Sequence, residues 1–372
     1  MSILTSGRYR AWAGFAIAAL LLFLVAPAVL SDFRLSLLGK FLCFAIVAVG
    51  IGLAWGRGGM LTLGQGVFFG LGAYMMAMHL KISDAQLRGD TVPDFMQIAG
   101  IRALPGYWVP FTSPVVTVLG ILLIPGLVAF ALGLGVFKRR VKGAYFAILS
   151  QALAAAFAIL LVGQQTTGGS NGLNRFRTFF GFNLNDPANK QMLFFITAGV
   201  LLAVVAIVRQ LMNSRYGELL VAVRDQEERV RFLGYDPANI KLVAYVTAAF
   251  FAGTAGALFV PIVGIISPAD VGIVPSIAFL IGVAIGGRAT LLGPVLGAIG
   301  VAWAQSAFSE SFPSGWIYAQ GLLFIVVVGF FPAGVAGLFA LLKRRQKASP
   351  DEPSSPGPED DTESTERMEM AR

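Results

Sequence analysis

The feature that most constrains this chain is a series of long stretches with almost no charged side chains. A helix that crosses a bilayer needs about 20 mostly apolar residues, because each backbone polar group must find its partner inside the helix. The candidate stretches lie near residues 11–30, 35–55, 61–79, 113–137, 144–162, 191–208, 242–262, 273–286, 291–308 and 316–341. The sequence therefore predicts an all-α, polytopic transmembrane helical bundle of about ten spans. Eight or nine spans are the alternative, because the 273–308 region contains one short stretch.

The composition excludes an ordinary soluble domain. Charged residues make up 13% of the 372 residues, about half the share in soluble proteins. Residues 349–372 differ from the rest, with eight acidic and two basic side chains among Pro and Ser. Such a segment cannot bury enough apolar surface to offset its ordering entropy. We therefore expect a transmembrane domain at 1–348 and a disordered acidic cytoplasmic tail at 349–372.

The basic residues predict which ends of the spans face the cytoplasm. With the N-terminus inside, 18 Lys and Arg residues fall in inner segments and seven in outer segments. This asymmetry follows the positive-inside rule, and it places both chain ends in the cytoplasm. The first apolar stretch exceeds the usual length of a signal peptide core, so we interpret it as a retained helix.

Enzymatic function is disfavoured by what the spans and loops contain. The chain has one His and one Cys and no phosphate-binding G-x-x-x-x-G-K-[ST] motif, so we expect no catalytic site, metal or cofactor. Polar groups within the spans are neutral, and Lys40 is the one clear charge, which we expect to snorkel outward. Neutral groups suit an uncharged or zwitterionic solute. Alternatively, they form hydrogen bonds between helices.

The inner segment 209–241 predicts a contact with a soluble partner. Its residues Tyr216–Leu233 show helical apolar spacing with mixed acidic and basic side chains on the other faces. Gly234 can end this helix in the left-handed conformation, and Asp236 can cap the next one. A helix lying on the lipid surface is the alternative, but its polar face would be more uniformly cationic.

An ordered set of motifs is similar to a known family. The motifs are GGMLTLGQGVFFGLGAY (Gly58–Tyr74), KGAYFAILSQALA (Lys142–Ala154), TGGSNGL (Thr167–Leu173), Ser214–Leu258, ISP (Ile266–Pro268) and GVAIGGRATLLGPVLGA (Gly282–Ala298). In this order they resemble permease subunits of the branched-chain amino acid and urea class of ABC importers. Within that class, the outer loop 81–112 resembles the urea-type subunit through VPDFM (Val92–Met96) and ALPGYW (Ala103–Trp108).

The resemblance implies a function and a set of partners. It implies a solute pathway for urea or short-chain amides in a bacterial inner membrane; a branched-chain amino acid permease subunit is the alternative. A passive channel for small neutral solutes is a third hypothesis. The implied partners are a second related permease subunit, two cytoplasmic ATPase subunits that bind the ATP, an extracytoplasmic solute-binding protein and the lipid bilayer, with no nucleic acid.

The resemblance also selects candidate residues. Polar residues in the matching motifs are candidates for the solute pathway: Thr62, Gln65, Ser150, Gln151 and Asn171. Asn171 lies in an outer loop and alternatively only shapes a turn. The segment that matches the family's ATPase-docking loop supplies the coupling candidates: Glu218, Arg224, Asp225, Arg229, Gly234 and Asp236.

Overall fold

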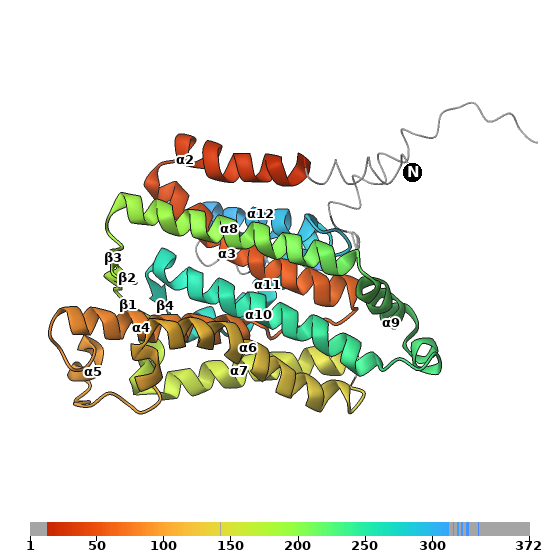
Figure 1. Cartoon of the computed structure of the whole chain (residues 1–372), viewed down its shortest axis with the longest axis horizontal. Coiled ribbons are helices and arrows are strands. Elements are labelled where there is room, and N and C mark those ends of the chain that lie inside the picture. The colour runs from red at the N-terminus through yellow and green to blue at the C-terminus, as the bar shows by residue number, and fades with distance from the viewer. Residues whose placement is uncertain are drawn as a thin grey trace, which may run out of the picture.

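The computed structural model describes residues 13–141 and 143–311, and beyond them only single residues and pairs between 315 and 334. Its long helices run side by side along the longest axis of the molecule (Figure 1). They are α3 (Asp32–Ile51), α4 (Gln65–Leu87), α6 (Pro114–Phe137), α7 (Ala144–Gly163), α8 (Pro187–Met212), α10 (Pro237–Val263), α11 (Ile273–Gly286) and α12 (Gly293–Ser311). The helical bundle that the apolar stretches predict is confirmed.

The other described helical elements lie before or between these helices. They are η1 (Leu21–Val25), α2 (Ala26–Val29), η2 (Gly52–Arg57), α5 (Asp94–Ile98), η3 (Val109–Thr112), η4 (Gln165–Thr167), η5 (Gly169–Asn171), α9 (Arg215–Phe232) and η6 (Pro268–Asp270). The sheet within the described residues consists of two antiparallel pairs, β1 (Leu173–Asn174) with β4 (Ile265–Ile266) and β2 (Thr178–Phe179) with β3 (Phe182–Asn183). The strands and α5 lie at one end of the body, the strand end, and α9 lies at the opposite end, the α9 end (Figure 1).

Six helical segments among the described residues are long and apolar enough to cross a membrane. They are Asp32–Arg57, Pro114–Phe137, Ala144–Gly163, Pro187–Met212, Pro237–Val263 and Pro268–Gly286. Helix α4 has the length, but His79, Lys81 and Asp84 make its last third more polar. The total of about ten spans stays a prediction. Its last stretch, 316–341, and the tail 349–372 lie outside the described residues apart from a few positions between 318 and 334.

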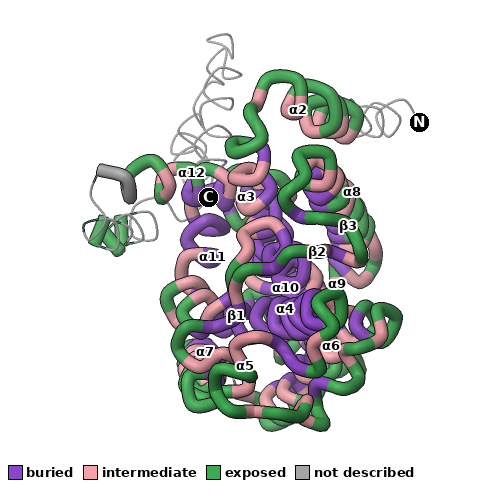
Figure 2. Tube along the Cα trace, turned by 90° about the vertical axis from the view of Figure 1, so that its left-hand side faces the viewer, coloured by how far each residue is buried: buried purple, intermediate pink, exposed green. Residues whose placement is uncertain are grey.

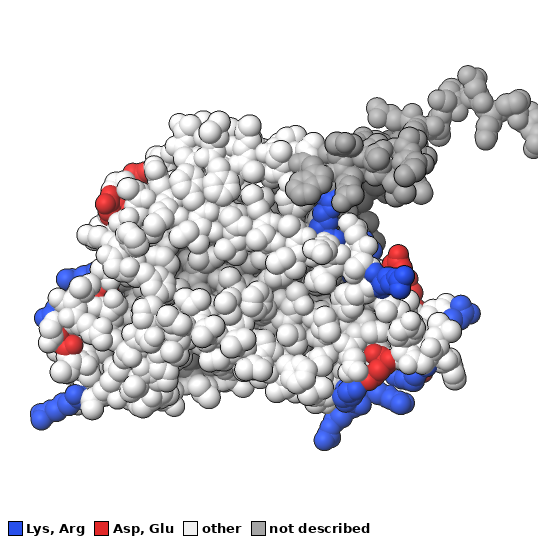
Figure 3. All heavy atoms as spheres, viewed as in Figure 1, with Lys and Arg blue, Asp and Glu red and all other residues white. Residues whose placement is uncertain are grey.

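Charged side chains gather at the two ends of the molecule. On the face drawn in Figure 3, Lys, Arg, Asp and Glu lie at the strand end and the α9 end, and the broad band between carries none. Since a charge facing hydrocarbon is costly, this uncharged band is the surface expected against lipid. The ten-span orientation itself, with both chain ends in the cytoplasm, remains a prediction.

The interior is built around α3, α4 and α10, which are buried along most of their length (Figure 2). Glycines let α4 and α10 approach closely. A Cβ atom at Gly72 would lie 1.9 Å from the Gly253 carbonyl oxygen, and one at Gly256 would lie 1.9 Å from that of Phe69. Backbones therefore touch at this crossing, as small residues permit in membrane proteins.

The outer loop predicted at 81–112 begins as helix. Helix α4 continues to Leu87 because polar groups in its last turns have partners. Lys81 forms an ion pair with Asp94 of α5 at 3.1 Å, and Asp84 accepts hydrogen bonds from the backbone N–H groups of Arg177 and Thr178 at 2.8 and 3.0 Å. Burial alone would raise the pKa of the Asp94 carboxyl, but the Lys81 hydrogen bond and charge outweigh it and lower that pKa. These contacts hold the strand end together.

Candidate functional site

Four polar residues from three helices and one turn converge where α4 begins. We name this group the polar junction: Thr62, Gln65, Ser150 and Ser276. Ser150 of α7 accepts a hydrogen bond from the Leu63 N–H at 2.9 Å, and Ser276 of α11 accepts one from the Gly66 N–H at 3.0 Å. Each hydroxyl also donates to a carbonyl of its own helix at 2.8 Å. Since the first N–H groups of a helix have no partner within it, Ser276 stabilises the start of α4 from outside.

Two members of the polar junction are buried without protein partners. Thr62 and Gln65 are at most 1% exposed. The Thr62 hydroxyl and both polar atoms of the Gln65 amide have no hydrogen-bond partner among the described residues. An unmade hydrogen bond of this kind costs about 1–3 kcal/mol. The junction therefore presents a neutral donor and acceptor pair to any polar solute or water that reaches it.

Close packing at the polar junction depends on glycine. A Cβ at Gly64 would lie 2.3 Å from the Ser150 carbonyl oxygen, and one at Gly66 would lie 2.5 Å from that of Val271. The turn 58–64 is thus in close backbone contact with α7, and the first turn of α4 is in close contact with the backbone just before α11. Irregular backbone within a membrane protein is tolerated where protein buries it or where it lines a cavity.

The remaining pathway candidates are not part of the polar junction. Gln151 follows Ser150 on α7 and is half-buried on another face of that helix. Asn171 is exposed in η5, where it lines a cavity of about 520 Å³ at the strand end together with Lys81. The sequence interpretation missed Ser276. Its signal was available, because Ser276 is the only polar side chain between residues 273 and 286.

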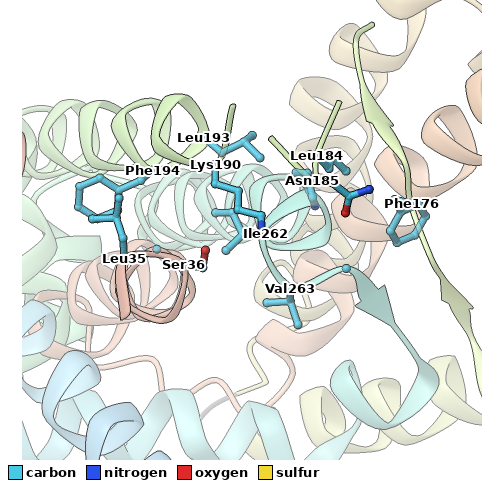
Figure 4. A pocket seen from close by; sticks show the side chains of 13 residues that line it. Leu35, Ser36, Phe176, Leu184, Asn185, Lys190, Leu193, Phe194, Ile262 and Val263 are labelled. Carbon is cyan, nitrogen blue, oxygen red and sulfur yellow. The ribbon is translucent and has the colours of Figure 1, made fainter. Parts of the chain in front are cut away.

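A second cavity at the strand end, of about 160 Å³, lies between α3, α8 and α10 (Figure 4). Its lining is mostly apolar, and Lys190 of α8 reaches into it. No acidic side chain among the described residues lines this cavity. Because Lys190 is the charged side chain among the described lining residues, the cavity favours an anionic group.

Helix α9 lies at the end of the bundle, as the amphipathic pattern predicts, but it is not continuous. Gln226 has nonhelical backbone angles (φ −147°, ψ 72°). The prediction of one unbroken helix over Tyr216–Leu233 is therefore wrong at this residue. Both pieces are attached to α10: the Tyr216 hydroxyl donates to the Ile240 carbonyl at 2.8 Å, and Lys241 pairs with Glu227 at 2.7 Å. Burial raises the pKa of the Tyr216 hydroxyl, consistent with its packing against the bundle.

The first piece of α9 contacts the turn that leads into the polar junction. The Arg224 guanidinium donates to the Gly56 carbonyl oxygen at 2.9 Å. The same guanidinium donates two further hydrogen bonds, at 2.7 and 3.2 Å, to the Asp225 carboxylate. Hydrogen bonding by Arg224 is the main cause of the lowered pKa of the Asp225 carboxyl. A Cβ at Gly59 would lie 2.7 Å from the Arg224 side chain. The turn and α9 are therefore in direct contact.

The predicted end of α9 and start of α10 are confirmed. Gly234 has φ +86°. Its N–H donates to the Arg231 carbonyl at 3.0 Å, and the next N–H donates to the Val230 carbonyl at 3.3 Å, which is the Schellman arrangement. Asp236 accepts from the Ala238 N–H at 3.0 Å and so caps α10. Two other coupling candidates, Glu218 and Arg229, are exposed on α9.

The glycine-rich segments around Gly56 and Arg288 pack against each other. A Cβ at Gly56 would lie 1.8 Å from the Arg288 carbonyl oxygen, and the Arg288 guanidinium lies 4.9 Å from the centre of the Trp55 ring. The Gly56 region, which is π-helical, is therefore held between α9 and the turn after α11. Such π-helical segments often occur at functional sites.

Comparison with known proteins supports a transport function. Residues 33–331 match the model of a family described as the permease component of branched-chain amino acid transport systems. The high-affinity branched-chain amino acid transport system permease protein LivM of Escherichia coli K12 is 26% identical over 341 residues, which cover 84% of this chain and 72% of LivM. LivM of Salmonella typhimurium LT2 is 25% identical with the same coverage. No solved structure matches.

Proposed function

Since the chain belongs to the family of branched-chain amino acid permease components and is a multi-pass inner-membrane protein, we propose that it forms one half of the solute pathway of an ATP-driven importer. In this proposal the α9 end faces the cytoplasm and docks an ATPase subunit. The other partners are a second related permease subunit, a second ATPase subunit and an extracytoplasmic binding protein. The chain itself hydrolyses no ATP.

The observation that carries this proposal is the direct contact between α9 and the turn that ends in the polar junction. Arg224 holds the Gly56 carbonyl, and nine residues further along the chain Gln65 begins α4. A displacement of α9 by a soluble motor would therefore act on the backbone next to the polar junction. A helix that merely rests on lipid would need no such contact.

The roles of the coupling candidates follow from their positions. Glu218, Asp225 and Arg229 are exposed on α9 and are proposed to face the ATPase. Arg224 is proposed to transmit movement to the turn, while Gly234 and Asp236 set the angle between α9 and α10. Thr62, Gln65 and Ser150 are proposed to contact the solute or its water shell. Gln151 and Asn171 remain candidates for other parts of the pathway.

Branched-chain amino acids are the proposed solutes, because both LivM relatives carry that specificity in their names. Urea, which the outer loop favours, is the second candidate. The unpartnered Gln65 amide supports it, because urea offers the matching carbonyl and N–H groups. A passive channel is the less favoured candidate, because it would need no helix such as α9 in contact with the turn that leads into the polar junction.

The experiment is uptake of labelled leucine into proteoliposomes that contain the complete complex, with the binding protein outside and ATP inside. We expect uptake that requires ATP and all partner subunits. Replacing Arg224 by Met should reduce uptake per ATP hydrolysed, whereas the matched variant Arg215→Met, which changes an exposed arginine of α9 outside the coupling candidates, should leave this ratio closer to wild type. Saturable uptake by this chain alone would contradict the proposal.

A further inference from the structure

A cavity of about 150 Å³ between α3, α10, α11 and α12 contains both signs of charge at membrane depth. Lys40 of α3 and Asp270 of η6 line it, together with the Gln305 amide of α12. Its remaining lining is apolar and includes the rings of Phe44, Phe259 and Phe279 among others. Of the three cavities described, this is the one lined by both a cation and an anion.

Lys40 lies inside a predicted span, about 12 Å along α3 from its first residue. It is half-buried, and among the described residues its ammonium group has no hydrogen-bond or ion-pair partner. Its nearest described interaction is with the Phe44 ring, whose centre lies 5.8 Å away. An ionisable side chain within a membrane span is a candidate for function by default.

Asp270 is held in place by its own turn. The backbone N–H and the hydroxyl of Ser267 both donate to the Oδ2 atom of Asp270, at 2.9 and 2.6 Å. This box orients the carboxylate at the start of the helical segment Pro268–Gly286. No ion pair joins Asp270 to Lys40 among the described residues. The two charges therefore line one cavity without a direct ion pair between them.

Buried charges need partners, because removing an ion from water is costly unless another charge and hydrogen bonds compensate. A cation and an anion that flank apolar rings would be compensated by a molecule with one carboxylate, one ammonium group and an aliphatic side chain. We propose that this cavity is a subsite for an aliphatic α-amino acid, with Lys40 binding the carboxylate, Asp270 binding the ammonium group and the phenylalanine rings contacting the side chain.

This subsite rests on the proposed function and specifies its substrate class. Urea carries no charge and would leave both Lys40 and Asp270 uncompensated. The cavity at Lys190 lacks an acid. In the cavity of about 520 Å³ that Asn171 lines, Lys81 is already paired with Asp94. The Lys40 cavity shares no lining residue with the neutral polar junction.

The test measures binding of labelled L-leucine to the purified complex of both permease and both ATPase subunits, without the binding protein. Leucinamide lacks the carboxylate and 4-methylpentanoate lacks the ammonium group. We expect each to compete at least about tenfold more weakly than leucine, because each loses one charge-assisted contact. Lys40→Met and Asp270→Asn should each raise the Kd for leucine about tenfold or more, and Lys40→Arg should restore part of the affinity.

Arg34→Met is the matched control, because Arg34 is an exposed cation of the same helix that lines none of the three cavities. It should change the Kd less than about twofold. Co-purification of all subunits and unchanged ATPase activity verify assembly of each variant. Equal competition by leucinamide on the wild-type complex would overturn the subsite even where a variant fails to assemble.

The failure of the subsite differs from the failure of the proposed function. Wild-type leucine uptake with unchanged Kd values in Lys40→Met and Asp270→Asn would overturn the subsite alone. No ATP-dependent leucine uptake by the wild-type complex would overturn the proposed amino acid specificity and the subsite with it.

Discussion

Replacing Ser276 by Ala should loosen the start of α4. The Ser276 hydroxyl accepts the Gly66 N–H at 3.0 Å and is buried. Alanine keeps the shape of the side chain but leaves this N–H without a partner, which costs about 1–3 kcal/mol. The Gly272 carbonyl loses the hydroxyl but keeps the Ser276 N–H at 3.4 Å. We therefore attribute the cost to one unsatisfied donor.

The assay is amide hydrogen exchange of the assembled complex in lipid nanodiscs, read on peptides that cover residues 61–70. Because local opening exposes amides in proportion to its equilibrium constant, 1–3 kcal/mol corresponds to exchange about 5–150-fold faster. Ser306→Ala is the control, since the Ser306 hydroxyl donates only to a carbonyl of its own helix. Equal exchange in both variants would refute the claim that Ser276 holds the α4 start.

Three further predictions concern the helix crossing and the α9 end. Gly72→Ala should prevent assembly or lower the melting temperature, since its Cβ would overlap the α10 backbone at a cost of about 1–3 kcal/mol or more; Gly300→Ala, where nothing lies within 4 Å, should be neutral. Gly234→Val should lower uptake per ATP hydrolysed, because a β-branched residue is strained at φ +86°. Lys138→Met should remove a small stabilisation, about 1 kcal/mol or less for this half-exposed pair with Asp236, detected as a lower melting temperature at pH 7.

The pH dependence of stability tests the explanation of Lys138→Met. The hydrogen bond from Lys138 is the main cause of the lowered pKa of Asp236. Its stabilisation is thus present above the ordinary aspartate pKa of about 4 and lost as the pH falls through the lowered value. A melting-temperature difference between wild type and Lys138→Met that persists below that value would contradict this explanation.

Gly100→Val is the control for Gly234→Val, because it places the same side chain at φ +77° in a loop of the strand end. An equal loss of uptake per ATP hydrolysed in Gly100→Val would show that the effect of Gly234→Val does not depend on α9.

Local features of the fold were predictable from the sequence because they depend on neighbouring residues. Apolar runs predicted the helices, and the ends of α11 at Ile273 and Gly286 agree with the predicted stretch. The same holds for the Gly234 turn and the Asp236 cap, where each hydrogen bond joins residues close together in the chain. The kink at Gln226 escaped prediction, since helical spacing continues on both sides of it.

Contacts between distant segments were only partly predictable. Gln65 and Ser150 could be selected from the sequence because they are polar residues within apolar stretches. The hydrogen bond from Gly66 to Ser276 could not be predicted, because it joins residues 210 positions apart. Lys40 was interpreted as a snorkelling residue because nothing in the sequence brings it to the same cavity as Asp270. Asp270 itself lies near the start of the apolar helical segment Pro268–Gly286, three residues before the predicted stretch 273–286, so the sequence assigned it to no span.

The central claim is that this chain carries branched-chain amino acids in an ATP-driven complex. The most direct measurement is uptake of labelled leucine and labelled urea, in parallel, by the complete reconstituted complex. We predict ATP-dependent accumulation of leucine that excess valine reduces and excess urea does not. ATP-dependent accumulation of urea, unaffected by excess leucine, would contradict the claim and restore the urea-type specificity that the outer loop suggests.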